Sequence, residues 1–122
     1  MLTSLYKALL TQLEPLAMPV FLTDCVPQGS CFPYMTAQIL APLSAGDAGQ
    51  IKLTIWCCAD TPNAERLLRT DALLALLPSR GLRLTLPDGA ALLRRTGTTL
   101  SVRDDIALGL QTTWQLQYYP HA

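Results

Sequence analysis

Apolar and polar residues alternate along three stretches of the chain, which predicts three long β-strands over residues 32–39, 50–58 and 107–119. The last stretch has the clearest pattern, with Trp114 and several leucines on one side and mainly glutamine and threonine on the other. Alternation of this kind is typical of antiparallel strands that bury one face and leave the other in water.

Shorter runs predict further strands over 19–23, 82–86 and 98–102. Residues 19–23 are expected at or near a sheet edge. Residues 90–95 fit either the start of a strand or a single helical turn, and Gly97 indicates a bulge or a break.

Leucines spaced by three and four residues predict a helix over residues 2–14. A second helix is predicted over residues 62–77, with Asp60 or Thr61 as its cap. On this helix Glu65 and Arg69 form an i,i+4 pair.

The polar face of the second helix is expected to include Arg66 and Thr70 as well. Its second half, residues 72–77, has no polar face. We therefore expect that half to be buried all round or to contact a partner.

The predicted elements follow the order α-β-β-β-α-β-β-β, which indicates one α+β domain over residues 1–122. We expect a mainly antiparallel sheet with the two helices packed on one face. The opposite face, rich in threonine and glutamine and containing Lys52, is then free for water or for a neighbouring subunit.

The composition favours an assembly component. Half of the 122 residues are hydrophobic and 15% are charged, whereas about 25% is usual for charged residues. A surface with few charges suits an oligomer; the alternative is a monomer whose surface is serine, threonine and glutamine. The net charge is zero, so no electrostatic argument favours nucleic acid or an anionic membrane as a partner.

No apolar run approaches the ~20 residues that cross a bilayer, and the first residues lack the pattern of a signal peptide. We therefore expect a cytoplasmic chain with reduced cysteines. The spacing of the four cysteines (Cys25, Cys31, Cys57 and Cys58) matches no zinc pattern.

Catalytic chemistry is not indicated. The only histidine is His121, the penultimate residue, so no histidine-based triad or metal cluster can be built around it. The aspartates fall in turn contexts. We therefore expect no catalytic residues, no cofactor and no metal. Arg94 and Arg95 are expected to be solvated or to pair with another subunit rather than to bind phosphate.

Trp56 is expected on the face opposite Ile51, Leu53 and Ile55. There it is either covered by the first helix or part of an interface. The pattern leaves both interpretations open.

The layout resembles a family of phage proteins. An N-terminal helix leads to the strand 19–21, a loop leads to 32–36, and a hairpin returns over 51–56. A helix with small and apolar residues follows, and the chain ends in strands closing with 116–119. This order resembles the tail terminators of long-tailed phages and prophages, also called tail-completion or minor tail proteins, over essentially the whole chain.

The resemblance implies a structural subunit without enzymatic activity. Such subunits form a homo-oligomeric ring, often a hexamer, on the end of the tail tube. The ring stops growth of the tube protein and presents a surface to the head–tail connector. It implies assembly in the cytoplasm of a bacterial host and a final place in the tail or neck of the virion, with no membrane and no sequence-specific nucleic acid as partners.

Within that resemblance, the hairpin tip is expected to contact the tube or face its lumen, and the second helix and the sheet are expected to supply subunit contacts. The candidate interaction residues are Ser44, Ala45, Gly46, Asp47, Ala48, Gly49, Trp56, Leu73, Leu76, Arg94 and Arg95.

Two alternatives remain open. One is a head–tail connector or stopper of similar size. The other is a small ligand-binding or thiol-dependent α+β domain.

Overall fold

The structure is a computed structural model that describes residues 2–23, 25–27, 29, 31–40, 48–77, 81–103 and 107–120. Its elements are α1 (Leu2–Leu13), the 3-10 helix η1 (Glu14–Leu16), β1 (Val20–Leu22), β2 (Tyr34–Leu40), β3 (Ala48–Cys58), α2 (Asn63–Leu76), β4 (Leu82–Leu86), β5 (Gly89–Arg103) and β6 (Ala107–Pro120).

The strands form one sheet in the order β1-β2-β3-β6-β5-β4. All neighbouring pairs are antiparallel except β1 and β2, which run parallel. Strands of a parallel pair cannot be joined by a tight hairpin turn, and residues 23–33 separate β1 from β2 along the sequence. The α+β class is confirmed, with a mixed sheet rather than a wholly antiparallel one, and β1 lies at an edge as expected.

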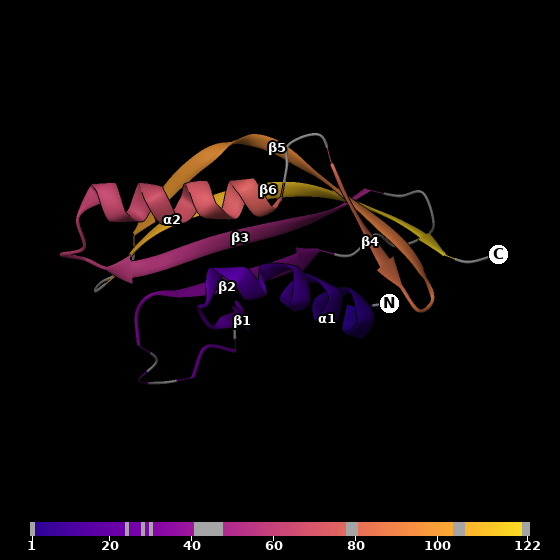
Figure 1. The fold of residues 1–122 in the computed structure, drawn as a ribbon, viewed down its shortest axis with the longest axis horizontal. Coiled ribbons are helices and arrows are strands. Elements are labelled where there is room, and N and C mark those ends of the chain that lie inside the picture. Colours follow the sequence, from indigo (N-terminus) through magenta and orange to yellow (C-terminus); the bar gives the residue numbers. More distant parts are fainter. Residues whose placement is uncertain are drawn as a thin grey trace.

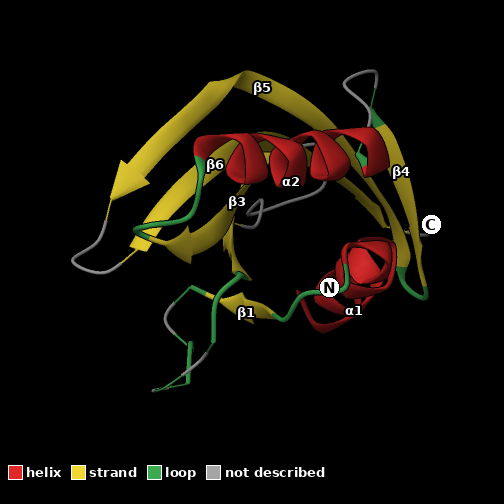
Figure 2. Ribbon diagram, turned by 60° about the vertical axis from the view of Figure 1, so that its left-hand side comes forward, coloured by secondary structure: helices red, strands yellow, loops and turns green. Residues whose placement is uncertain are grey.

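The sheet is strongly curled, and both helices lie within its curve (Figures 1 and 2). Because side chains alternate along each strand, the register gives the sheet one apolar face. Ile51 pairs with Trp114, and Leu93 pairs with Leu116. The strand residues of the core are Met35, Ala37, Ile51, Leu53, Ile55, Cys57, Leu84, Leu86, Ala91, Leu93, Trp114 and Leu116.

Helix α1 fills the opening of this curled sheet with Leu5, Leu9 and Leu13, all of which are fully buried. Polar side chains of α1 also contact the elements around it. The hydroxyl of Tyr6 donates to the carbonyl oxygen of Val20 at 3.2 Å. The Nε2 of Gln12 donates to the carbonyl oxygen of Leu76 at 3.3 Å. Helix α1 is thereby tied to both the β1 edge and the end of α2.

Helix α2 packs in an orientation that the sequence prediction had wrong. Arg66 and Thr70 are buried toward the sheet together with Leu73 and Leu77. These four positions are spaced by four, three and four residues, so they share one side of the helix. Two residues of the expected polar face, Arg66 and Thr70, therefore lie on the side of α2 that packs against the sheet.

The start of α2 also differs from the prediction. The helix begins at Asn63, Pro62 is the N-cap, and no side chain caps the helix. Pro62 suits this position because proline lacks the N–H group that would otherwise stay unpaired. Neither Asp60 nor Thr61 caps the helix.

Residues 90–95 belong to the long strand β5, not to a helical turn. The pairing of β5 with β6 shifts between Thr96 and Leu100. The irregularity expected at Gly97 is therefore confirmed.

Replacing Leu9 by alanine tests the packing of α1. The side chain is fully buried, so Leu9→Ala should lower the free energy of unfolding by about 2–4 kcal/mol, because it removes apolar burial and leaves a cavity. Urea denaturation followed by circular dichroism measures the loss. The exposed neighbour Thr11 on the same helix provides the control, since Thr11→Ala should change stability by less than about 0.5 kcal/mol. Equal effects of the two variants would contradict the position of α1.

Candidate interaction surfaces

The outward side of α2 carries apolar side chains. Leu67 is 57% exposed and Leu68 is 67% exposed, the two largest exposures among the large hydrophobic residues that the structure describes. One charged residue, Asp71, follows them on the next turn. We call the outward positions the α2 ridge: Ala64, Leu67, Leu68, Asp71, Ala72 and Ala75. All six are exposed, and their spacing places them along one side of the helix.

The ridge is exposed because other residues of α2 occupy the side of the helix that packs on the sheet. Only one side of α2 can meet the sheet, and it carries Arg66, Thr70, Leu73 and Leu77. The leucines at 67 and 68 must then point outward. Apolar groups of this size gain stability when they leave water, so the ridge is suited to contact another surface.

The second surface is the face of the sheet turned away from the helices, which we call the outer face. The strand register places on it Tyr34, Thr36, Gln38, Leu40, Ala48, Gln50, Lys52, Thr54, Trp56, Cys58, Arg83, Thr85, Ala90, Leu92, Arg94, Thr96, Ala107, Gly109, Gln111, Thr113, Gln115, Gln117 and Tyr119. Three of these residues are basic and none is acidic. Side chains on this face also bond to one another, as the indole nitrogen of Trp56 donates to Thr36 Oγ1 at 3.0 Å.

A hollow of about 270 Å³ lies on β4, β5 and β6 and is lined by Arg83, Ala90, Ala91, Leu92 and Tyr119. We call it the β4–β5 hollow. Tyr119 is 49% exposed, and its hydroxyl donates to Gln117 Oε1 at 3.1 Å. Arg83 is exposed as well. The hollow thus combines apolar lining with a cationic side chain.

The structure distributes the predicted interaction residues unevenly. Ala48 and Gly49 are not part of a loop tip but the first residues of β3, where they pair with Gln117 and Leu116. The reason is that β3 pairs with β6 beyond the point where its pairing with β2 begins. The other predicted tip residues, Ser44, Ala45, Gly46 and Asp47, lie outside the described residues.

Two leucines predicted for subunit contacts lie mainly inside the fold. Leu73 is fully buried in the core, so its predicted contact with another subunit is wrong for the chain folded in this way. Leu76 is half-buried and packs against the core. The residues that the prediction missed are Leu67 and Leu68. No sequence signal marks them, because apolar residues occur on both sides of α2 and the sequence does not show which side faces the sheet.

Arg94 and Arg95 are both exposed, yet they do not form one site. As neighbours on a strand they point to opposite faces. Arg94 shares the outer face with Gln115, whereas Arg95 lies opposite Trp114 on the inner face. Trp56 is half-buried on the outer face, away from the helices, so it is not covered by the first helix.

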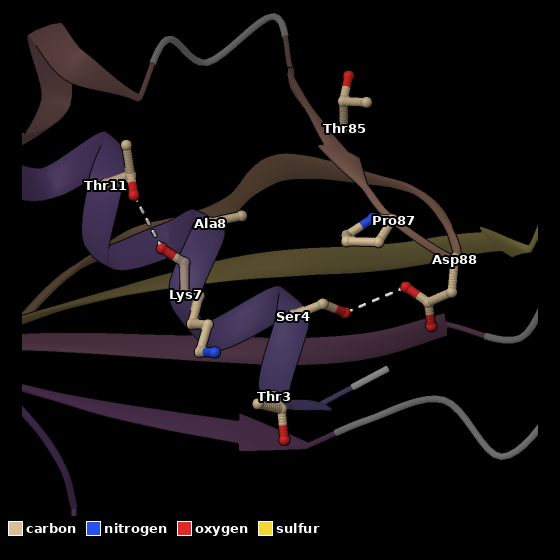
Figure 3. Close-up of a pocket in the computed structure, with 8 residues that line it drawn as sticks. All are labelled: Thr3, Ser4, Lys7, Ala8, Thr11, Thr85, Pro87 and Asp88. Atoms are coloured by element: carbon tan, nitrogen blue, oxygen red, sulfur yellow. Dashed lines mark hydrogen bonds between the residues drawn. The ribbon is translucent and has the colours of Figure 1, made fainter.

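An open groove of about 500 Å³ runs between α1 and the turn after β4 (Figure 3). The hydroxyl of Ser4 donates to Asp88 Oδ1 at 3.1 Å, and the hydroxyl of Tyr118 donates to Asp88 Oδ2 at 2.9 Å. These bonds connect α1, the β4–β5 turn and β6. The hydrogen bond from Tyr118, above all, lowers the pKa of Asp88. Desolvation and the Asp88 carboxylate raise the pKa of Tyr118.

The environment of Cys57 does not activate its thiol. Cys57 is buried, and its burial raises the pKa of its thiol, although Arg69 and Arg66 act in the opposite direction. The nucleophilic form of cysteine is the thiolate, so this environment opposes reactivity. The Cys58 thiol instead donates to Asp60 and lowers the pKa of that carboxyl. Within the described ranges, no group of three or more histidine, cysteine, aspartate or glutamate side chains could hold a metal ion.

Comparison with known proteins supports the fold. No family model and no curated protein matches the chain. The chain is similar to a solved structure whose name states no function, with a TM-score of 0.63, 18% sequence identity and 99% coverage of each chain. At this identity the likeness shows a shared fold. Neither helix in the described part of the chain has the length and apolar character needed to cross a membrane.

The bonds at Asp88 predict a pH dependence of stability. Because folding lowers the pKa of Asp88, its contribution is complete above the unfolded value of about 3.9 and is lost as the pH falls through the folded pKa. Tyr118→Phe should weaken this loss between about pH 5 and pH 2, measured by urea denaturation at several pH values. Tyr119→Phe is the matched control and should keep the wild-type acid dependence. The same acid dependence in all three proteins would rule out the contribution of Tyr118.

Arg66 gives a second prediction. Its side chain is 9% exposed; it donates to Asn63 Oδ1 at 3.2 Å and to the carbonyl oxygen of Gly109 at 3.5 Å, while its Nε has no partner among the described residues. A buried charge without a carboxylate partner costs desolvation energy. Arg66→Met should therefore leave the free energy of unfolding unchanged or raise it by up to about 2 kcal/mol.

The control for Arg66→Met is Arg69→Met on the same helix. Arg69 pairs with Glu65 at 3.0 Å near the surface, and its loss should cost at most about 1 kcal/mol. Chemical denaturation compares both variants with the wild type. A loss of more than about 2 kcal/mol for Arg66→Met would show that its bonds outweigh its desolvation.

Proposed function

We propose that this chain is a structural subunit of phage tail assembly, a tail terminator that forms a ring on the end of the tail tube, stops its growth and joins it to the head connector. The observation that carries the proposal is the α2 ridge. The core of the domain is filled by other side chains, and Leu67 and Leu68 of α2 remain exposed on the side of the helix turned away from the sheet. Such a surface is expected when copies of a protein, or a protein and its partners, cover one another.

Three further features support a role in assembly. The chain has few charges for its size, its outer face combines neutral polar side chains with three basic ones, and its layout resembles the tail-terminator family. A ring subunit uses extended surfaces rather than a concave catalytic site. In this proposal assembly takes place in the cytoplasm of the bacterial host, and the ring remains at the neck of the virion.

Electron microscopy of tails made in the host tests this function. A phage lacking the gene should produce tails of uncontrolled length, because nothing stops polymerisation of the tube, and expression of the wild-type chain should restore uniform length. Tails of normal length that fail to join heads would instead identify a connector or stopper. Normal virions without the gene would contradict both functions.

The ridge provides a specific variant for this assay. Changing Leu67 and Leu68 together to serine should leave the fold intact, since both side chains are exposed, but should abolish control of tail length, because the apolar contact is lost. Leu22→Ser is the matched control, as Leu22 is 37% exposed on β1 and lies on neither the ridge nor the outer face. It should support tails of normal length. Normal tails from the double-serine variant would argue against the ridge as a contact surface.

A further inference from the structure

We propose that the α2 ridge of one copy docks into the β4–β5 hollow of the next copy, with Asp71 of the first facing Arg83 of the second. The proposal rests on the proposed ring function and adds the two surfaces through which the copies join. The two surfaces belong to different parts of the same chain, so each copy offers one of each.

The shapes and polarity of the two surfaces are complementary. The ridge projects Leu67 and Leu68, which are more than half exposed, whereas the hollow is lined by Ala90, Leu92 and the ring of Tyr119. A volume of about 270 Å³ accommodates a side chain of leucine size. Burying leucine side chains against this lining removes apolar area from water on both copies.

The charges are complementary as well. Asp71 is the only charged residue of the ridge, and Arg83 lines the hollow. No ion pair of either residue occurs within the described part of the chain. Arg94 and Lys52 add positive charge to the outer face, which carries no acidic residue at its described strand positions. An acidic ridge is therefore attracted to the hollow, and a basic one would be repelled.

The positions of the two surfaces make the contact head-to-tail. Helix α2 packs on the inner face of the sheet (Figure 2), and Arg83 and Leu92 point to the outer face, so one copy cannot fill its own hollow. A contact between two different patches repeats from copy to copy and closes into a ring when the rotation permits.

A symmetric dimer through either surface is disfavoured. Ridge against ridge would bring the two Asp71 side chains together, and outer face against outer face would oppose Lys52 and Arg94 with their own copies. Like charges in such arrangements repel. The charge distribution thus favours the contact between unlike surfaces.

The area that the ring contacts would cover is consistent with the small number of charged residues on the surface. A contact of standard size covers about 800 Å² on each partner. A ring subunit makes the contact twice, which would cover about 1,600 Å² of its 7093 Å² accessible surface. A subunit covered to this extent needs fewer charges than a free monomer.

Charge reversal tests the pairing. The variants are Asp71→Arg, Arg83→Asp and the combination of both, with Glu14→Arg as control, because Glu14 is exposed on η1 outside both surfaces. Analytical ultracentrifugation measures the concentration at which half of the chain is assembled, and negative-stain microscopy with tail tubes measures capping. Thermal denaturation checks that each variant is folded.

Each single reversal should weaken assembly by about tenfold or more, the combined variant should return to within about threefold of the wild type, and the control should behave as wild type. If rings form regardless of the single reversals, or if the combined variant is no better than either one, the ridge-to-hollow contact is wrong while the ring function stands. If the wild-type chain forms no ring in solution or on tubes, the proposed function falls together with the contact.

Discussion

Both helices of this fold compete for one apolar face of a curled sheet. Helix α1 brings Leu5, Leu9 and Leu13 to that face, and α2 brings Leu73 and Leu77. Trp114 is fully buried in the same core, and its indole nitrogen donates to Thr112 Oγ1 at 3.1 Å. Because this single core accepts only one side of each helix, any apolar side chains on the other side must remain in water or meet another molecule.

That constraint explains the unusual orientation of α2. Leu73 and Leu77 anchor the end of the helix in the core, and helical geometry then carries Arg66 and Thr70 inward as well. Thr70 satisfies its hydroxyl within the helix by donating to the carbonyl oxygen of Arg66 at 3.0 Å. The orientation that buries Arg66 beneath α2 also leaves Leu67 and Leu68 exposed. The packing of Leu73 and Leu77 near the C-terminal end of α2 thus determines that Leu67 and Leu68, nearer its N-terminal end, point outward.

The sequence predicted most of the strands, both helices, the edge position of β1 and the irregularity near Gly97, because all of these depend on local alternation and turn residues. It did not predict the parallel pairing of β1 with β2, because alternation along a strand does not show the direction of the neighbouring strand. It also placed Arg66 on an exposed face. Apolar residues occur on both sides of α2, and periodicity alone cannot show which side meets the sheet. The resemblance to tail terminators provided the functional hypothesis, and the ridge provided a surface on which to test it.

In the proposed assembly the outward side of α2 is covered by another molecule. Hydroxyl-radical footprinting of the free chain and of the chain bound to tail tubes measures this most directly, since labelling reports the exposure of individual side chains. We expect Leu67 and Leu68 to be labelled in the monomeric chain and strongly protected on the tail, with the exposed Leu22 labelled equally in both states. Equal labelling of Leu67 and Leu68 in the two states would show that this side of α2 is not covered on the tail.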